Sequence, residues 1–163
     1  MKVIIAIDQS GNWTQIIDSV LRRQWPKDTQ FKILTVIAPF QWEQLDSPEW
    51  QKSAKRIYEA RRLAAQSIIT DARHVIQQGI PFAQVHVELK QGSPRDHIVR
   101  TAIEWMADKI LLGAHGHSPN RLFGAVPRTV SAHAPCSVEL VRLHKPVHET
   151  SDERSEHKSR VAI

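Results

Sequence analysis

Apolar residues gather in five short segments of the chain, and these segments follow two patterns. Residues 2–7, 30–38 and 110–112 are largely apolar and do not alternate with polar positions, which is typical of strands covered on both faces. Residues 85–89 and 137–141 alternate apolar and polar side chains, which predicts strands with one wetter face or a place at a sheet edge. We therefore expect five strands, of which three are central.

Between these strands, apolar residues recur at three- and four-residue spacing and predict helices. Asn12 and Ser93 precede two of them as expected N-caps, and Gly79 is expected to close the longest. The four helices are expected over residues 13–25, 49–78, 94–106 and 125–133. On the second and third helices, the side chains expected to be buried are Ala54, Ile57, Tyr58, Ala65, Ile68, Ala72, Val75, Ile98, Val99, Ala102, Ile103 and Met106.

Strand and helix alternate strictly along residues 1–143, which predicts a single α/β domain with helices on both faces of the sheet. Central positions for the first, second and fourth strands suit a doubly wound five-stranded parallel sheet of order 3-2-1-4-5. Residues 144–163 carry four basic and four acidic side chains and few apolar ones. We expect this segment to be a disordered tail.

Composition narrows the class of protein. The chain has 163 residues, 41% of them hydrophobic and 24% charged, with a single cysteine. These values are ordinary for a globular protein, and one cysteine fits a reducing compartment. With no signal peptide and no apolar run of about 18 residues, the expected location is cytoplasmic, without membrane attachment. The net charge is +5, but the basic residues are scattered along the chain among acidic ones. We therefore do not expect nucleic-acid binding.

The candidate chemistry lies in residues 112–124, which read LGAHGHSPNRLFG. In a sheet of order 3-2-1-4-5, this segment and residues 8–12 meet at the carboxyl edge, beside the point where the strand order reverses. Glycines before a helix there leave backbone N–H groups available to an anion, and they allow positive φ or close approach. A tight turn that needs small residues only for packing remains an open alternative.

The motifs together resemble the universal stress protein family. The resemblance covers about residues 1–143 and rests on three segments that agree in order and spacing. Residues 5–10 read IAIDQS and residues 91–94 read QGSP. The most specific segment begins LGAHGHS at residue 112 and continues to SAHAPCSV at residues 131–138.

The resemblance implies that an adenine nucleotide, ATP or AMP, binds at the glycine loop, with Mg²⁺ accompanying ATP. In the ATP-binding branch the loop reads G-x2-G-x9-G-[ST]. Gly113 and Gly116 match its beginning, but only seven residues separate Gly116 from Gly124, and Ala125 replaces the hydroxyl residue. Arg121 and Arg128 are candidates to compensate at a phosphate.

The resemblance also assigns roles within the site. Asp8 is expected near the ribose, the backbone around Val36 and Ile37 near the adenine, and the glycines with Ala125 and Val126 around the phosphates. A helix-start acid satisfied by local N–H groups is the alternative for Asp8. The full set of candidate nucleotide-binding residues is Ile7, Asp8, Ser10, Val36, Ile37, Leu112, Gly113, His115, Gly116, His117, Arg121, Gly124, Ala125 and Val126.

Other chemistry has less support in the sequence. His115 and His117 lack an evident third ligand, so no metal site is expected. No hydrolase, Walker A or dinucleotide motif is present, and no catalytic residue is assigned. Trp42 and Trp50 are expected to fill the underside of the loop at residues 40–48, with capping of an adenine as the alternative.

Three hypotheses therefore remain: a nucleotide-binding regulatory protein, a stress-response dimer that acts through protein partners without a nucleotide, and a weak ATP hydrolase. We also expect a homodimer, because the last strand is an apolar edge without proline or lysine. The family resemblance points the same way. The residues of that edge are Ser137, Val138, Glu139, Leu140 and Val141.

Overall fold

The computed structural model describes residues 1–41, 44–114 and 124–143. The strands are β1 (Lys2–Ala6), β2 (Gln30–Ile37), β3 (Gln84–Gln91), β4 (Lys109–Ala114) and β5 (Ser137–Arg142). The helices are α1 (Trp13–Leu21), α2 (Pro48–Gly79), α3 (Pro94–Trp105) and α4 (Ala125–His133). The predicted alternation of strand and helix is confirmed.

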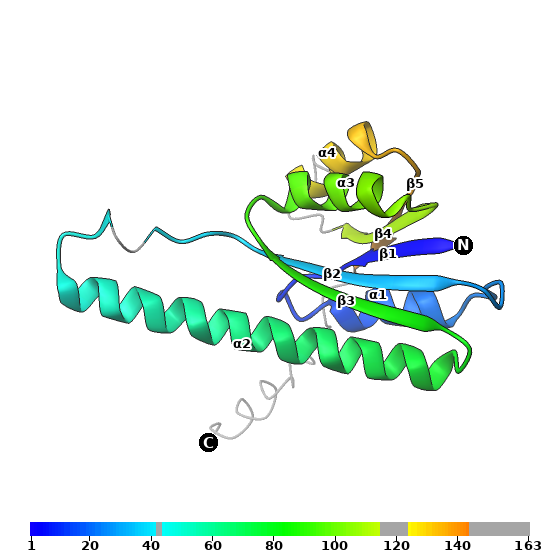
Figure 1. Ribbon diagram of the computed structural model, residues 1–163, viewed down its shortest axis with the longest axis horizontal. Coiled ribbons are helices and arrows are strands. Elements are labelled where there is room, and N and C mark those ends of the chain that lie inside the picture. Colours follow the sequence, from blue (N-terminus) through cyan, green and yellow to red (C-terminus); the bar gives the residue numbers. More distant parts are fainter. Residues whose placement is uncertain (42–43, 115–123, 144–163) are drawn as a thin grey trace, which may run out of the picture.

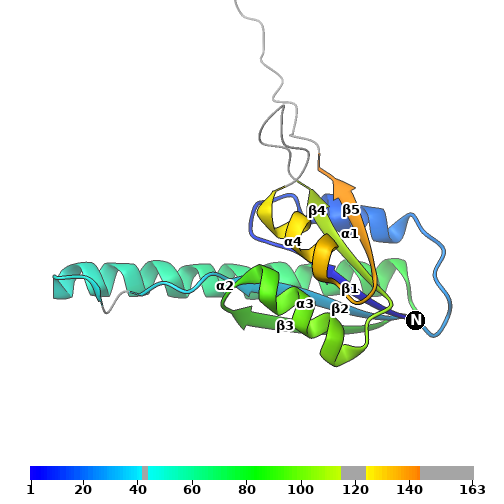
Figure 2. The same ribbon diagram turned by 90° about the horizontal axis from the view of Figure 1, so that it is seen from above.

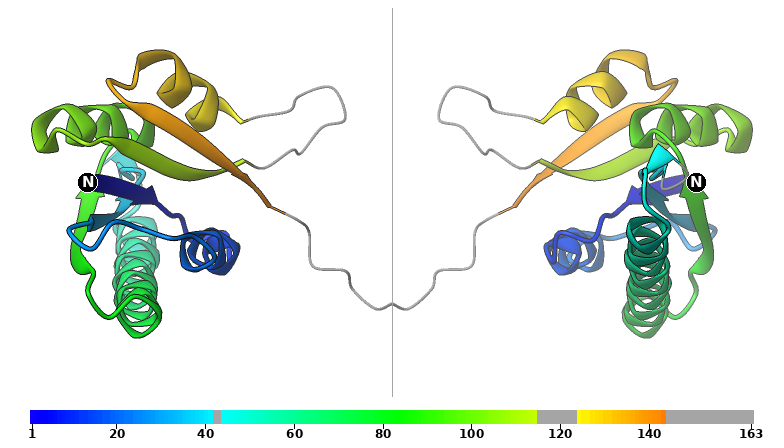
Figure 3. Two further views of the ribbon diagram at one scale, coloured as in Figure 1. Left: turned by 90° about the vertical axis from the view of Figure 1, so that its right-hand side faces the viewer. Right: turned by 90° about the vertical axis from the view of Figure 1, so that its left-hand side faces the viewer.

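All five strands are parallel and lie in the order β3-β2-β1-β4-β5, as the sequence predicts. Helices α1 and α2 cover one face of the sheet and α3 and α4 cover the other (Figure 3). β1 pairs in register with β2 from Lys2–Gln30 to Ala6–Leu34. The strand order reverses between β1 and β4, and the helices that follow these two strands, α1 and α4, lie on opposite faces of the sheet.

Burial follows the two sequence patterns. The central strands supply Ile4, Ile5, Phe31, Ile33 and Leu111, each with 1% or less of its surface exposed. The edge strands β3 and β5 are only partly buried along their length. The distinction between unbroken and alternating apolar segments therefore predicted the central and edge positions correctly.

One helix boundary and the side-chain bonds of two N-caps differ from expectation. α1 ends at Leu21 rather than at Trp25, and the Trp25 ring instead packs edge-on against Phe31, 5.1 Å away between ring centroids. Asn12 and Ser93 hold the N-cap positions, but neither side chain makes a capping hydrogen bond. The Asn12 carboxamide oxygen instead accepts a bond of 3.3 Å from the Gln15 side chain.

Some side chains expected to be buried are exposed. Ile57 is exposed because the first half of α2 extends beyond the sheet (Figures 1 and 2). Ile103 and Met106 lie near the end of α3 and are 58% and 73% exposed. The apolar positions of this helix therefore cover a wider part of its circumference than the part that packs against the sheet. Trp50, expected to pack under the neighbouring loop, is 70% exposed, and Trp42 lies outside the described residues. No helix in the described part of the chain is long and apolar enough to span a membrane.

Candidate functional site

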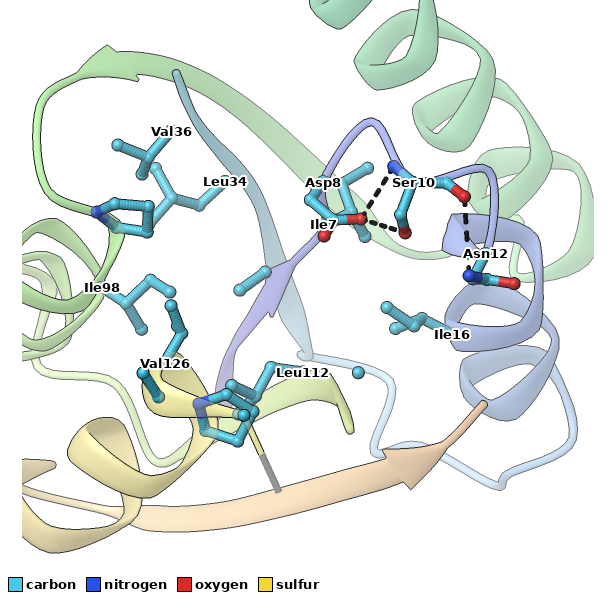
Figure 4. Close-up of a pocket in the computed structure, with 16 residues that line it drawn as sticks. Ile7, Asp8, Ser10, Asn12, Ile16, Leu34, Val36, Ile98, Leu112 and Val126 are labelled. Atoms are coloured by element: carbon cyan, nitrogen blue, oxygen red, sulfur yellow. Dashed lines mark hydrogen bonds between the residues drawn. The ribbon is translucent and has the colours of Figure 1, made fainter. Parts of the chain in front are cut away.

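A pocket of about 500 Å³ lies at the carboxyl edge of the sheet, beside the ends of the neighbouring strands β1 and β4 (Figure 4). This volume falls within the range of small-molecule sites. Its walls are mostly apolar, with a polar group at the end of β1. The described residues that line it are Ala6, Ile7, Asp8, Ser10, Asn12, Ile16, Leu34, Val36, Pro94, Ile98, Leu112, Gly113, Gly124, Ala125, Val126 and Pro127.

The loop after β1 is held by short-range hydrogen bonds. One Asp8 carboxylate oxygen accepts from the Ser10 backbone N–H at 3.1 Å and from the Ser10 hydroxyl, which are dashed in Figure 4. Gly11 follows with φ of 79°, a conformation that side-chain-bearing residues rarely adopt. The Asp8 carboxylate is exposed, lines the pocket and is the one ionisable side chain among the described lining residues. Its local bonds match the helix-start alternative, and its position also faces the pocket.

The end of β2 presents its backbone to the pocket. The Ile7 N–H donates to the Leu34 carbonyl at 3.1 Å, and the Ile7 carbonyl accepts from the Thr35 hydroxyl at 3.0 Å. β1 ends there, while β2 continues to Ile37. Successive residues of a strand point their backbone groups to opposite sides. Since Leu34 bonds toward β1, the backbone N–H and C=O of Val36 also point to that side, beside the pocket.

Ile37 is placed differently. Its carbonyl accepts from the Gly92 N–H at 3.0 Å, on the β3 side, and its side chain packs with Tyr58 and Ala65. Of the two residues expected beside an adenine, only Val36 lines the pocket.

The glycines of the predicted loop have different structural settings. Gly113 lies inside β4, and its φ is not positive, since Gly11 and Gly92 are the described glycines with positive φ. A Cβ there would meet the Leu143 side chain at 2.6 Å, so packing explains Gly113. Gly113 therefore does not adopt the positive φ that was one of the two reasons expected for a glycine there.

Gly124 is the N-cap of α4, and the nearest atom to an added Cβ, Pro127 Cδ, lies 3.8 Å away. The first-turn N–H groups of a helix have no acceptor within it. Because Gly124, Ala125 and Val126 line the pocket, the positive end of the α4 dipole faces the cavity.

The structure brings together most of the predicted site residues. Those that line the pocket are Ile7, Asp8, Ser10, Val36, Leu112, Gly113, Gly124, Ala125 and Val126. His115, Gly116, His117 and Arg121 lie outside the described residues. Across the described part of the chain, no three His, Cys, Asp or Glu side chains are grouped as a metal site would need.

Sequence reasoning missed one wall of the pocket. Pro94 and Ile98 of α3 line it, and both lie on the first turns of a helix whose N-terminus is at the carboxyl edge of the sheet (Figure 4). The signal was present, because every helix of a parallel α/β sheet begins at that edge. The remaining lining residues, Ala6, Asn12, Ile16, Leu34 and Pro127, flank residues that were predicted.

Comparison with known proteins gives one family. The model of the universal stress protein family matches residues 1–142. The structure is similar to universal stress protein UspA from Lactobacillus plantarum, with a TM-score of 0.67 and 22% identity over 87% of this chain and 97% of that one.

Two similar structures carry nucleotides. A family member from Arabidopsis thaliana with AMP bound matches with a TM-score of 0.64 and 17% identity, over 88% of this chain and 92% of that one. The universal stress protein from Archaeoglobus fulgidus in complex with dAMP matches with a TM-score of 0.58 and 19% identity, over 86% and 97%. At these identities the structures show a shared fold.

Proposed function

The chain belongs to the universal stress protein family, and on this premise we propose that its pocket binds an adenine nucleotide and that the bound state regulates protein partners. The observation that carries the proposal is the combination of an apolar cavity with an exposed carboxylate at one side and a helix N-terminus at another. Relatives from Arabidopsis thaliana and Archaeoglobus fulgidus hold AMP and dAMP, which supports the same class of ligand.

The adenine would lie against β2. Leu34, Val36 and Ile98 provide apolar contact area for a flat base, and the Val36 backbone offers one donor and one acceptor on the pocket side. An adenine edge also presents one donor group beside an acceptor nitrogen, so the two edges are complementary.

The ribose and phosphates would lie toward Asp8 and α4. A carboxylate accepts hydrogen bonds from ribose hydroxyls, and Asp8 is exposed at the pocket wall. The backbone N–H groups around Gly124, Ala125 and Val126 would bind a phosphate at the start of α4. Among the described residues, no atom lies closer than 3.8 Å to an added Cβ at Gly124, which would permit a phosphate to approach the backbone there.

AMP or ATP satisfies these groups, with Mg²⁺ accompanying ATP. Ala125 cannot donate a side-chain hydrogen bond to a phosphate, and such a bond to a charged group contributes about 1.5–3 kcal/mol. Arg121 and Arg128 are the nearby basic residues in sequence that would compensate.

Calorimetric titration of the full chain with AMP and with ATP plus Mg²⁺ tests the proposal, and GMP controls for base recognition. We expect saturable binding of an adenine nucleotide and none of GMP. Asp8→Asn keeps the oxygen that accepts from Ser10 but removes the charge, and we expect about tenfold weaker binding. Asp18→Asn, at an exposed position on α1, is the matched control. Absence of binding, with no nucleotide released on denaturing freshly purified protein, would contradict the proposal.

We also propose that the chain forms a homodimer through the outer edge of β5, whose residues are Ser137, Val138, Glu139, Leu140 and Val141. β5 ends the sheet and has a strand on one side only. The Leu143 N–H donates toward β4, so by alternation the N–H of Arg142 points to the open edge. Light scattering should therefore give twice the 18.6 kDa mass of the chain.

Arg142→Pro removes an outward donor without breaking the β4–β5 ladder, and it should shift the protein toward monomer, whereas Arg142→Ala should not. A monomeric mass for the unaltered protein at micromolar concentration would overturn the dimer. A dimer that binds no nucleotide would instead support the alternative of a stress-response dimer acting through protein partners.

A further inference from the structure

The first half of α2 extends away from the rest of the fold. Residues 48–64, which we call the projecting arm, run past the carboxyl edge of the sheet (Figures 1 and 2). α2 has 32 residues, while its neighbour α1 has nine. α1 therefore covers only the second half of α2.

One side of the arm continues the side of α2 that packs on α1. A Cβ at Gly79 would meet Leu21 of α1 at 2.6 Å, and Ile68 packs against the cluster that contains Ile16 and Ile17. Steps of seven and eleven residues back from Ile68 stay on nearly the same side of a helix. They lead to Arg61 and Ile57, and a further step of seven reaches Trp50.

This side of the arm is uncovered where α1 is absent. Ile57 and Trp50 are 59% and 70% exposed. Apolar side chains that continue a helix-packing stripe into solvent mark a surface to which a further segment can bind.

The arm is also basic. It carries five basic side chains and two acidic ones, a surplus of three positive charges. Among the described residues, Arg62 pairs with Glu59 at 3.1 Å, and the other four basic side chains have no ion-pair partner. Two such arms would repel each other, so their charge disfavours a second copy of the arm as the occupant. The basic residues are Lys52, Lys55, Arg56, Arg61 and Arg62.

The chain leaves the described structure close to this surface. Leu143 lies over Gly113 beside Ile16 of α1, since both side chains lie within 3.3 Å of a Cβ built on that glycine. The loop before α1 in turn contacts the arm, because the Gln9 side chain donates to the Arg61 carbonyl. Leu143 is therefore separated from the arm by about the width of two helices, roughly 20 Å.

The 20 residues that follow Leu143 are long enough to reach the arm, and one stretch among them is acidic. An extended chain of that length spans up to about 68 Å, and the 17 residues of the arm span about 25 Å of helix. Residues 149–156 hold four acidic side chains and one basic one, a surplus of three negative charges. The final residues, 161–163, are apolar and read VAI.

From this match we propose that residues 144–163 bind along the projecting arm of the same chain. The acidic run 149–156 lies against the basic side chains of the arm, and residues 161–163 contact Trp50. Because the tail starts at the Arg61 end and its apolar terminus reaches the Trp50 end, it runs antiparallel to α2. The contact is independent of nucleotide binding.

Zero-length coupling of carboxylates to lysines with a carbodiimide tests the contact in the full chain. The amines of Lys52 and Lys55 should couple to carboxylates of residues 149–156, and mass spectrometry should identify these peptide pairs. Coupling a mixture of ¹⁴N- and ¹⁵N-labelled protein distinguishes cross-links within one chain from cross-links between two chains, since contacts within one chain give no mixed-isotope pairs. Predominantly mixed pairs, or no pair between the arm and the tail, would overturn the proposal.

Amide hydrogen exchange provides an independent test. Reversing the four acids in Glu149→Lys, Asp152→Lys, Glu153→Lys and Glu156→Lys should speed exchange of residues 48–64 about three- to tenfold. Reversing the four tail bases in Lys145→Glu, Arg154→Glu, Lys158→Glu and Arg160→Glu is the matched control and should leave the arm protected. Adding Lys52→Glu and Lys55→Glu to the first variant should restore protection. Equal exchange of the arm in all variants would refute the contact.

Discussion

The side chain of Leu143 occupies the space where a Cβ on Gly113 would lie, with its Cδ1 2.6 Å from that position. Gly113 was predicted as part of a phosphate loop, yet its lack of a side chain is explained by its contact with the residue that follows β5. Gly124, at the other end of the same sequence motif, has no comparable neighbour among the described residues. The two glycines therefore predict opposite results when alanine replaces them.

Gly113→Ala should destabilise the fold, because the new methyl group overlaps Leu143 and approaches Ile16 at 3.2 Å. Since the closest atom is the end of a flexible side chain, we expect a loss of about 1 kcal/mol, at the low end for overpacking. Urea denaturation measures it. Adding Leu143→Ala should make the cost of Gly113→Ala smaller than in the native background. Equal costs in both backgrounds would contradict the contact.

Gly124→Ala should leave stability within about 0.5 kcal/mol of the original, because its φ of −67° and ψ of 175° suit any residue. The methyl group would extend into the space proposed for a phosphate, so affinity for AMP should fall about tenfold, while affinity for adenosine changes little. Titration with both ligands and a denaturation curve check this. Equal losses for AMP and adenosine would place the phosphate elsewhere.

Ala125→Ser restores a hydroxyl at the first position of α4, where the residue is exposed. A new hydrogen bond to a charged phosphate should improve affinity for AMP about tenfold. Ala132→Ser, near the other end of the same helix, controls for a general effect of serine. Adenosine affinity should not respond to either substitution.

Glu88 should make stability dependent on pH in the acid range. Burial alone raises the pKa of its carboxyl, but the hydrogen bond from Lys90 and the charge of Lys32 together lower the pKa below the ordinary 4.5. The Lys90 ammonium lies 3.1 Å away, and that of Lys32 lies 3.5 Å away without hydrogen-bond geometry to its carboxylate oxygen. The unfolded chain therefore takes up the proton at higher pH than the folded one.

The stabilisation from Glu88 is complete above its ordinary pKa and is lost as the pH falls below about 4.5 through the lower folded value. Glu88→Gln should reduce the drop in thermal midpoint between pH 6 and pH 3, whereas Glu104→Gln, at an exposed position of α3, should not. An unchanged pH profile in Glu88→Gln would show that the ion pairs contribute nothing.

The sheet itself could be derived from the chain because its signals are local. Unbroken apolar runs at β1, β2 and β4, and alternation at β3 and β5, distinguish central from edge strands through burial alone. Alternating strand and helix then leave few topologies, and the order follows. Helix ends were less predictable, since Trp25 continues the apolar spacing of α1 but packs on Phe31 instead.

The amino-acid sequence by itself determined the fold class, the strand order, the family and most of the residues around the pocket. Tertiary structure alone decided that Gly113 packs against Leu143, that Val36 rather than Ile37 faces the cavity, and that α3 supplies a wall. It also decided that α2 extends beyond α1 and leaves Trp50 and Ile57 exposed. The physical reason is that periodicity reports which side of an element is apolar, whereas the neighbour that covers it is set by segments distant in the chain.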